Sequence, residues 1–91
     1  MLRLFVMAYL YILYSSTIGQ YYVGATLDLD DRLRRHNNGF SKSTRKGIPW
    51  VLVYIEEYAT KGEAMKREVM IKKMKSRIYI ENLIRKSSLS G

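Results

Sequence analysis

The sequence predicts an α+β fold in which a small, mostly antiparallel sheet of three strands is flanked by helices, in the order β-β-α-β-α-α. Two observations predict it. Aromatic and β-branched residues gather in the short runs 9–14, 21–24 and 50–56, and helix-capping residues precede the stretches 28–37, 61–74 and 77–85. With 91 residues the chain has the size of one domain. We take residues 8–86 as its core, 1–7 as an N-terminal extension and 87–91 as a tail.

The first two strands are expected to pair as a hairpin. The connection from Ser15 to Gln20 is made of small hydroxyl residues and a glycine, which favour turns. Gly24 ends the second strand, and the absence of a side chain there lets a backbone or a phosphate approach closely. Thr26 or Asp28 then caps a helix that runs to about Asn37.

The second half of the chain is predicted to contain one strand and two helices. A basic loop rich in hydroxyl groups, residues 40–49, is expected to be exposed and to precede the strand 50–56. Thr60 and Glu63 form a capping box that opens a helix to about Met74. Ser76 caps a last helix to about Arg85.

Composition excludes several classes of protein. The chain has no cysteine, which excludes a disulfide scaffold and a thiolate zinc site, and its single histidine, His36, excludes a set of imidazole ligands. The net charge is +8, and most of it lies in residues 61–91, with nine basic and three acidic side chains. Such an excess is typical of a protein that binds a polyanion, either nucleic acid or an anionic membrane surface.

The N-terminus resembles a secretory signal only superficially. A positive start precedes an apolar run that is shorter than the ~20 residues needed to span a bilayer, and no small-residue cleavage site follows. Tyr9, Tyr11 and Tyr14 alternate with aliphatic residues in this run, which favours a strand. We therefore expect a cytoplasmic protein without a membrane segment, and leave open whether Met1 or Met7 is the start.

Three features carry candidate chemistry. Tyr11 and Tyr22 fall on strands predicted to pair, so their side chains can share one face of the sheet. Arg32 and His36 are spaced i, i+4 and share a helix face; a guanidinium suits phosphate oxygens, and an imidazole can accept a proton near neutral pH. The alternative interpretations are that the two tyrosines only pack in the sheet and that Arg32 and His36 belong to a solvated basic helix surface.

Glu68 is the third feature. It falls on the apolar stripe of the helix 61–74, between Ala64 and Ile71, where a carboxylate must be paired or must bind a metal. Arg67 or Lys72 can form the salt bridge, whereas one carboxylate holding Mg²⁺ together with waters and substrate oxygens is ordinary magnesium chemistry.

Together these residues resemble the GIY-YIG nuclease family, and the small stand-alone members most closely, over about residues 8–86. The resemblance rests on Tyr9-Leu10-Tyr11, Tyr22-Val23-Gly24, the helix with Arg32 and His36, the later helical Glu68, and the runs His-Asn-Asn-Gly, Met-Lys-Ser-Arg and Tyr-Ile-Glu-Asn-Leu. The chain departs from the family pattern at four positions. Tyr9 stands where the name-giving glycine would be, Leu10 and Val23 replace isoleucines, and Ala25 stands where some repair members have a lysine.

The resemblance implies divalent-metal-dependent hydrolysis of DNA phosphodiester bonds, in repair, recombination or processing. The implied catalytic residues are Tyr11, Tyr22, Arg32, His36, Glu68 and Asn82. Within this set Glu68 would hold Mg²⁺ or Mn²⁺ and Asn82 would support the site. Either His36 or Tyr11 would be the general base. Flanking phosphates would be neutralised by Lys42, Arg45, Lys46, Lys72, Lys73, Lys75 and Arg77.

Two other functions stay open at this point. The fold can serve as a nucleic-acid-binding module without turnover, or the chain can be a basic structural protein whose partner is RNA or an anionic surface. We expect no small-molecule organic cofactor, and a monomer or a weak homodimer. The five residues Tyr11, Tyr22, Arg32, His36 and Glu68 are predicted to converge on one concave, basic surface at the edge of the sheet.

Overall fold

The computed structural model describes residues 7–90, and side chains as far as residue 87. Its elements are β1 (Ala8–Ser15), β2 (Gln20–Thr26), α1 (Leu29–Asn37), a short 3-10 turn η1 (Arg45–Gly47), β3 (Val51–Tyr58), α2 (Lys61–Met74) and α3 (Arg77–Ser90). The predicted order β-β-α-β-α-α is confirmed. The expected extension lies mostly outside the described residues, and the last helix continues past Arg85, where we had ended it.

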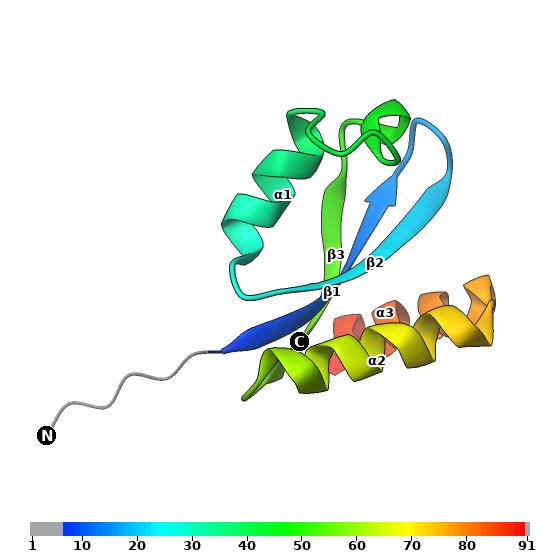
Figure 1. Ribbon diagram of the computed structural model, residues 1–91. Coiled ribbons are helices and arrows are strands. Elements are labelled where there is room, and N and C mark those ends of the chain that lie inside the picture. The colour runs from blue at the N-terminus through cyan, green and yellow to red at the C-terminus, as the bar shows by residue number, and fades with distance from the viewer. Residues whose placement is uncertain (1–6, 91) are drawn as a thin grey trace, which may run out of the picture.

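The three strands form one antiparallel sheet with β1 in the centre, in the order β2-β1-β3. Because side chains alternate along a strand, β1 supplies two separate layers of core. Leu10 and Ile12 point to the face covered by α2 and α3, where Ile71 packs on them. Tyr11 and Leu13 point to the face covered by α1, next to Trp50. Figure 1 shows α1 on one side of the sheet and the pair α2–α3 on the other.

Local capping chemistry sets where the helices begin. The Asp28 side chain accepts a hydrogen bond from the Asp31 amide at 3.0 Å, which decides between the two caps considered for α1. Thr60 and Glu63 form the predicted capping box at the start of α2. Ser76 accepts from the Tyr79 amide at 3.0 Å at the start of α3. The sequence signals for these three helix starts are therefore confirmed.

A polar network ties α2 to β3. Arg67 donates to both oxygens of the Glu56 carboxylate, at 2.9 and 3.1 Å, and also to the Tyr79 hydroxyl at 3.1 Å. The hydroxyls of Tyr54 and Tyr58 donate to the same carboxylate. Two-point Arg–carboxylate pairing of this kind fixes orientation as well as position. It holds α2 at a defined rotation on the sheet, which in turn fixes where the neighbouring residue Glu68 points.

The basic loop 40–49 is only partly the exposed segment that we expected. Lys42, Arg45 and Lys46 are exposed, but Thr44 and Gly47 are buried. The Trp50 indole donates to the Thr44 carbonyl at 2.7 Å, and the Asn37 side chain pairs with the Trp50 backbone. These bonds fasten the loop to the end of α1 and to the start of β3.

Candidate active site

A chain of hydrogen bonds joins β1, α1 and the loop beneath the surface. The Tyr11 hydroxyl lies 3.1 Å from His36 Nε2, and His36 Nδ1 lies 3.0 Å from the Thr44 hydroxyl. Tyr11 is 1% exposed and His36 is 3% exposed. His36 thus lies within the core, with both ring nitrogens occupied.

The surroundings of His36 determine which nitrogen carries the proton. Burial lowers the pKa of His36, and the nearby positive charge of Arg32 lowers it further, so the ring is neutral at pH 7. The Thr44 hydroxyl donates to the Ser41 carbonyl at 3.4 Å and is left to accept from His36 Nδ1–H. We therefore assign Nε2 as the acceptor of the Tyr11 hydroxyl proton.

His36 is expected to titrate below the ordinary histidine value of 6.5. Because folding lowers this pKa, the contribution of His36 to stability is complete above pH 6.5 and is lost as the pH falls through the folded-state value. NMR of the imidazole carbons against pH measures it directly. Arg32→Gln should raise the value by removing a neighbouring cation. A ring that titrates at or above 6.5 would contradict the expected effect of burial and of Arg32 on this pKa.

Gly24 explains how the Tyr11 ring reaches His36. A Cβ at this position of β2 would overlap the end of the Tyr11 ring and its hydroxyl. The glycine predicted to admit a backbone or a phosphate therefore admits the Tyr11 phenol. Burial and the neighbouring Tyr22 raise the pKa of Tyr11 to about 12, against the opposing effect of Arg32. Tyr11 is consequently a phenol at neutral pH.

A cavity of about 210 Å³ opens beside this chain, lined by Tyr22, Arg32, Arg35, His36, Phe40 and Ser41. The Tyr22 ring meets the His36 ring edge-on with centroids 4.8 Å apart, and its centroid lies 6.2 Å from that of Tyr11. Leu29 and Leu33 pack the same side of α1 into the core. The cavity is thus lined by one tyrosine ring, an imidazole and two guanidinium groups.

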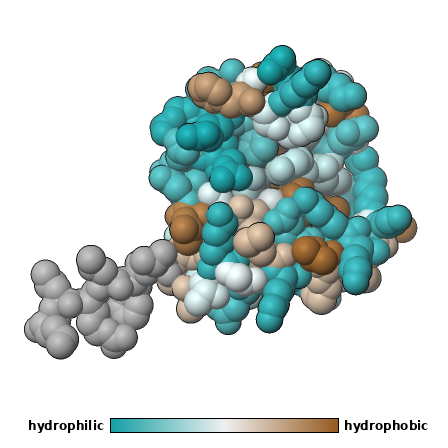
Figure 2. All heavy atoms as spheres, in the orientation of Figure 1, coloured by the Kyte–Doolittle hydropathy of each residue, from teal (hydrophilic) through white to brown (hydrophobic). Residues whose placement is uncertain are grey.

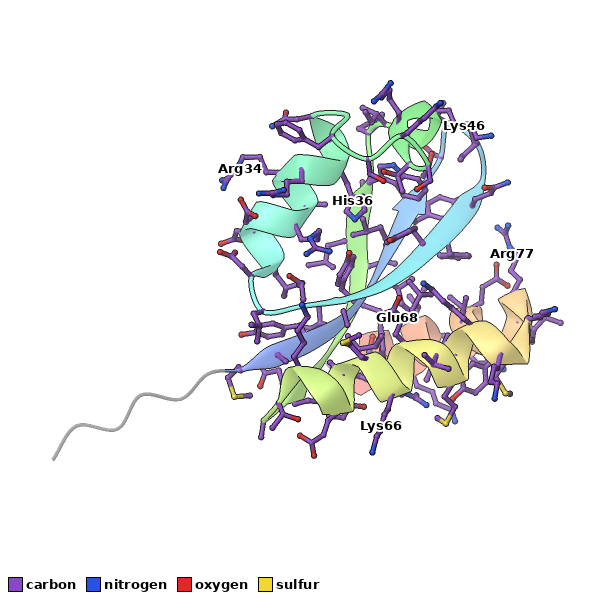
Figure 3. The ribbon with its side chains drawn as sticks, viewed as in Figure 1. Arg34, His36, Lys46, Lys66, Glu68 and Arg77 are labelled. Atoms are coloured by element: carbon purple, nitrogen blue, oxygen red, sulfur yellow. The ribbon has the colours of Figure 1, made fainter. Side chains whose placement is uncertain are left out.

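Glu68 reaches this region from the opposite layer, around the open edge of β2. Its carboxylate is 21% exposed and accepts from Lys72 Nζ at 2.6 Å, and Lys72 lies 5.7 Å from the centre of the Tyr22 ring. The negative charge of Glu68 also acts on Tyr11, whose pKa it raises. In Figure 3, Glu68 lies on the side of α2 turned toward β2 and His36, whereas Lys66 points away.

The structure therefore brings together the five residues that we expected to converge: Tyr11, Tyr22, Arg32, His36 and Glu68. It also contains one of the two salt bridges considered for Glu68, the one with Lys72. Arg67 pairs with Glu56 instead. Asn82 is elsewhere, on α3, where its side-chain oxygen accepts from Arg85 at 2.5 Å. No hydrogen bond among residues 7–87 links Asn82 to the five.

The predicted phosphate-binding residues are exposed and fall on two sides of the site. Lys42, Arg45 and Lys46 lie on the loop, where Arg45 also donates to the Gly39 carbonyl at 3.0 Å. Lys72, Lys75 and Arg77 border the groove between β2 and the α2–α3 junction. Lys73 follows Lys66 by seven residues, which places it on the outer face of α2, away from the site.

Sequence reasoning missed Thr44, which positions His36. The residue stood in a loop with two serine side chains, Ser41 and Ser43, and nothing local distinguished it. Its role depends on a contact eight positions back along the chain. Phe40 and Arg35 were missed in the same way. Both line the cavity, and the Arg35 guanidinium lies 5.9 Å from the centre of the Phe40 ring.

The donor set fits Mg²⁺ or Mn²⁺ held largely by waters and substrate. Within the described part of the chain, no three histidine or carboxylate groups come together as a metal cage. Glu68 offers one half-exposed hard oxygen ligand, and Mg²⁺ is commonly bound by one or two carboxylates with substrate phosphates. Lys72 now neutralises that carboxylate, so a metal ion would compete with its ammonium group.

Comparison with known proteins gives a consistent result. The GIY-YIG catalytic domain matches residues 7–82. A UPF0213 protein of Streptococcus pneumoniae is 42% identical over 75% of this chain and 69% of its own length. A second, from Bacillus pumilus, is 44% identical over 71% of this chain and 70% of its own.

A solved structure agrees. The solution NMR structure of the UPF0213 protein BH0048 from Bacillus halodurans superposes with a TM-score of 0.55 at 36% identity, covering 87% of this chain and 83% of that one. None of the described helices is long and apolar enough to cross a bilayer. The sequence, the sheet with its three helices and these relatives agree, and the chain belongs to the GIY-YIG family.

Proposed function

We propose that the protein is a divalent-metal-dependent DNA endonuclease that hydrolyses phosphodiester bonds. The observation that carries this proposal is the buried chain Tyr11–His36–Thr44, which ends beside a cavity lined by Arg32 and lies within electrostatic reach of Glu68. Hydrolysis of a phosphodiester needs a base for water, positive charge for the phosphate oxygens and help for the leaving oxygen. The first two requirements each have a candidate residue in the cluster.

The proton path runs through Tyr11 to His36. With a pKa of about 12, Tyr11 alone is a poor base, whereas the neutral His36 ring presents Nε2 to the Tyr11 proton. If a water gives its proton to the Tyr11 oxygen while Tyr11 gives its own proton to Nε2, the products are a hydroxide for the attack and a protonated imidazole. Thr44 holds the ring in the required tautomer. Both residues that we considered as the base then act in one relay.

Positive charge on the cavity wall serves the phosphate. Arg32 lines the cavity and is close enough to lower the pKa of both Tyr11 and His36. A guanidinium placed there suits the non-bridging oxygens, where charge develops during attack. Tyr22 lines the same cavity and would orient the phosphate or the water.

Glu68 is the residue that would hold the metal ion, with Lys72 displaced from the carboxylate. Bound there, Mg²⁺ or Mn²⁺ would supply charge neutralisation at the scissile phosphate. Asn82 accepts from Arg85 on α3, and its supporting role stays a prediction. We place the activity in the cytoplasm, in DNA repair, recombination or processing, by a monomer or a weak homodimer.

One observation favours a second function, a non-catalytic module that binds nucleic acid. The Glu68 carboxylate is already neutralised by Lys72 at 2.6 Å, and a permanent salt bridge there would leave the site without a metal ligand. The basic surface would still bind DNA. The two functions differ in turnover and not in affinity.

A panel of DNA substrates tests the proposal. Purified protein is incubated with supercoiled, linear, branched and single-stranded DNA in Mg²⁺, Mn²⁺ or EDTA. We expect cleavage only with a divalent ion, and lost activity in His36→Ala. Salt-sensitive binding without cleavage of any substrate would favour the module.

The loop cations are expected to set part of the salt dependence of binding. Replacing Lys42, Arg45 and Lys46 together by glutamine should weaken binding and flatten the log–log salt slope by up to ~3 if each contacts a phosphate. Fluorescence anisotropy of a labelled duplex in EDTA measures this. Lys66→Gln, on the outer side of α2, is the control. An unchanged slope in the triple variant would show that the loop does not touch DNA.

A further inference from the structure

A second and larger cavity, of about 400 Å³, lies between the edge of β2 and the junction of α2 with α3. Val23, Ile71 and Ile80 supply apolar walls, Tyr21 and Tyr22 supply aromatic ones, and Lys75 stands at the rim. A concave, mainly apolar pocket with a few polar groups is the usual form of a small-ligand site. The catalytic scheme above makes no use of this cavity.

The aromatic wall is extended by an arginine. The Arg77 guanidinium lies 5.1 Å from the centre of the Tyr21 ring and donates to the Gly19 carbonyl at 2.7 Å, so it is held in place over the ring. Aromatic rings and guanidinium planes are the surfaces on which unstacked nucleic-acid bases stack. The wall therefore has the chemistry to bind a flat heterocycle.

The charges at the rim favour a base over a second phosphate inside the cavity. Three cations line the cavity: Lys72, Lys75 and Arg77. Two of them are neutralised, because Lys72 is paired with Glu68 and Arg77 with Glu81. Lys75 has no hydrogen-bond or ion-pair partner among the described side chains. One unpaired cation at the mouth of an apolar pocket matches one nucleotide, with its base inside and its phosphate outside.

Lys75 occupies a backbone position that usually belongs to glycine. It ends α2 with φ at +47°, in the left-handed region. Glycine is the usual residue in this conformation because it has no Cβ. A lysine there accepts a local cost that a glycine would avoid, which fits a side chain kept for contact with a ligand.

The cavity adjoins the candidate active site at Tyr22. Tyr22 lines both hollows, and Lys72 lines this one while pairing with Glu68. Figure 2 shows this face as mixed, with hydrophobic spheres among hydrophilic ones over its middle and lower parts. A strand whose phosphate lies at Arg32 can thus present a neighbouring base to the pocket.

We propose that this cavity binds one unstacked base of the DNA strand held at the active site, and that the substrate class is DNA with an unpaired or displaced strand. This inference rests on the proposed function for the position of the scissile phosphate. The inference further implies that the protein binds an intact duplex, whose bases are all stacked, less tightly than a single strand with equivalent phosphates.

Binding in EDTA tests the inference without any cleavage. Two labelled 12-nucleotide strands are compared, oligothymidylate and a fully abasic strand with the same phosphates. The wild type is expected to bind oligothymidylate about tenfold or more tightly than the abasic strand. This is the order of the affinity gained from stacking one base on an aromatic side chain. Tyr21→Leu, which keeps an apolar side chain, should remove most of that ratio. Tyr9→Leu, outside the pocket, should leave it unchanged.

Lys75→Gly gives a second variant that is not expected to misfold. Glycine suits the left-handed position, so the melting temperature should be unchanged or higher, while affinity for both strands falls and the salt slope flattens by ~0.7. Equal affinity of the wild type for both strands, or a ratio that survives Tyr21→Leu in a folded protein, would overturn the inference. The nuclease proposal would still stand if the wild type cleaved DNA with a divalent ion.

Discussion

Glu68→Ala is expected to abolish divalent-dependent cleavage, with a loss of at least about a hundredfold, the order seen when one charge-stabilising group is removed from an active site. Glu68 is the one carboxylate among the five converging residues, so none of the other four can take its place. DNA affinity in EDTA should stay within about twofold or rise slightly, because the change removes a negative charge near the phosphates. Plasmid nicking and anisotropy on the same preparation measure both quantities.

The stability of that variant separates the metal role from a structural one. Lys72 is 50% exposed, and i, i+4 ion pairs of this kind contribute only about 0.3–0.5 kcal/mol. Thermal melting of Glu68→Ala should therefore change little. Glu57→Gln, an exposed carboxylate on β3, is the matched control and should keep full activity. A Glu68→Ala protein that still nicks DNA at the wild-type rate would show that Glu68 holds no catalytic metal.

Gly24→Ala is expected to cost activity by displacing Tyr11, although it removes no reacting group. The added methyl would overlap the end of the Tyr11 ring, which is buried and cannot swing into solvent. Overpacking of this kind costs about 1–3 kcal/mol of stability. Displacing the hydroxyl from His36 Nε2 by about 1 Å should lower the cleavage rate about a hundredfold. Nicking under single-turnover conditions, with melting as a check on folding, measures the effect.

Gly62→Ala is the matched control for that substitution. Gly62 lies in the first turn of α2, and a Cβ there meets nothing closer than the Thr60 hydroxyl at 3.9 Å. Alanine is a better helix former, so the variant should gain about 0.5–1 kcal/mol of stability and keep its activity. Full activity in Gly24→Ala would mean that the Tyr11–His36 bond is not used in catalysis.

The parts of the fold that sequence predicted well are those decided by local interactions. Asp28, Thr60 and Ser76 bond to amides three residues ahead, so their effect is visible in the sequence itself. The alternation of Leu10, Tyr11 and Ile12 likewise fixed which side chains share a face of the sheet. The prediction that α3 ends at about Arg85 was wrong. The residues after Arg85 carry no stop signal before Gly91, and the helix continues to Ser90.

The parts that could not be predicted depend on contacts between distant residues. Arg67 pairs with Glu56, eleven positions away on another element, and not with its neighbour Glu68. Gly24 serves Tyr11 across the sheet, which required the register Tyr11–Gly24 to be known. The resemblance to the GIY-YIG family supplied the five converging residues and also Asn82, whose side chain bonds to Arg85 on α3 and, within residues 7–87, to none of the five.

Single-turnover cleavage from a preformed complex tests the central claim most directly. Supercoiled plasmid is saturated with protein in EDTA, and an excess of Mg²⁺ or Mn²⁺ is then added. We predict that nicked circles appear only after the metal, in amounts proportional to bound protein, and that the rate falls as the pH is lowered and His36 becomes protonated. Plasmid that stays bound and intact with either ion, at every pH tested, would contradict the account and identify a module that binds DNA without cutting it.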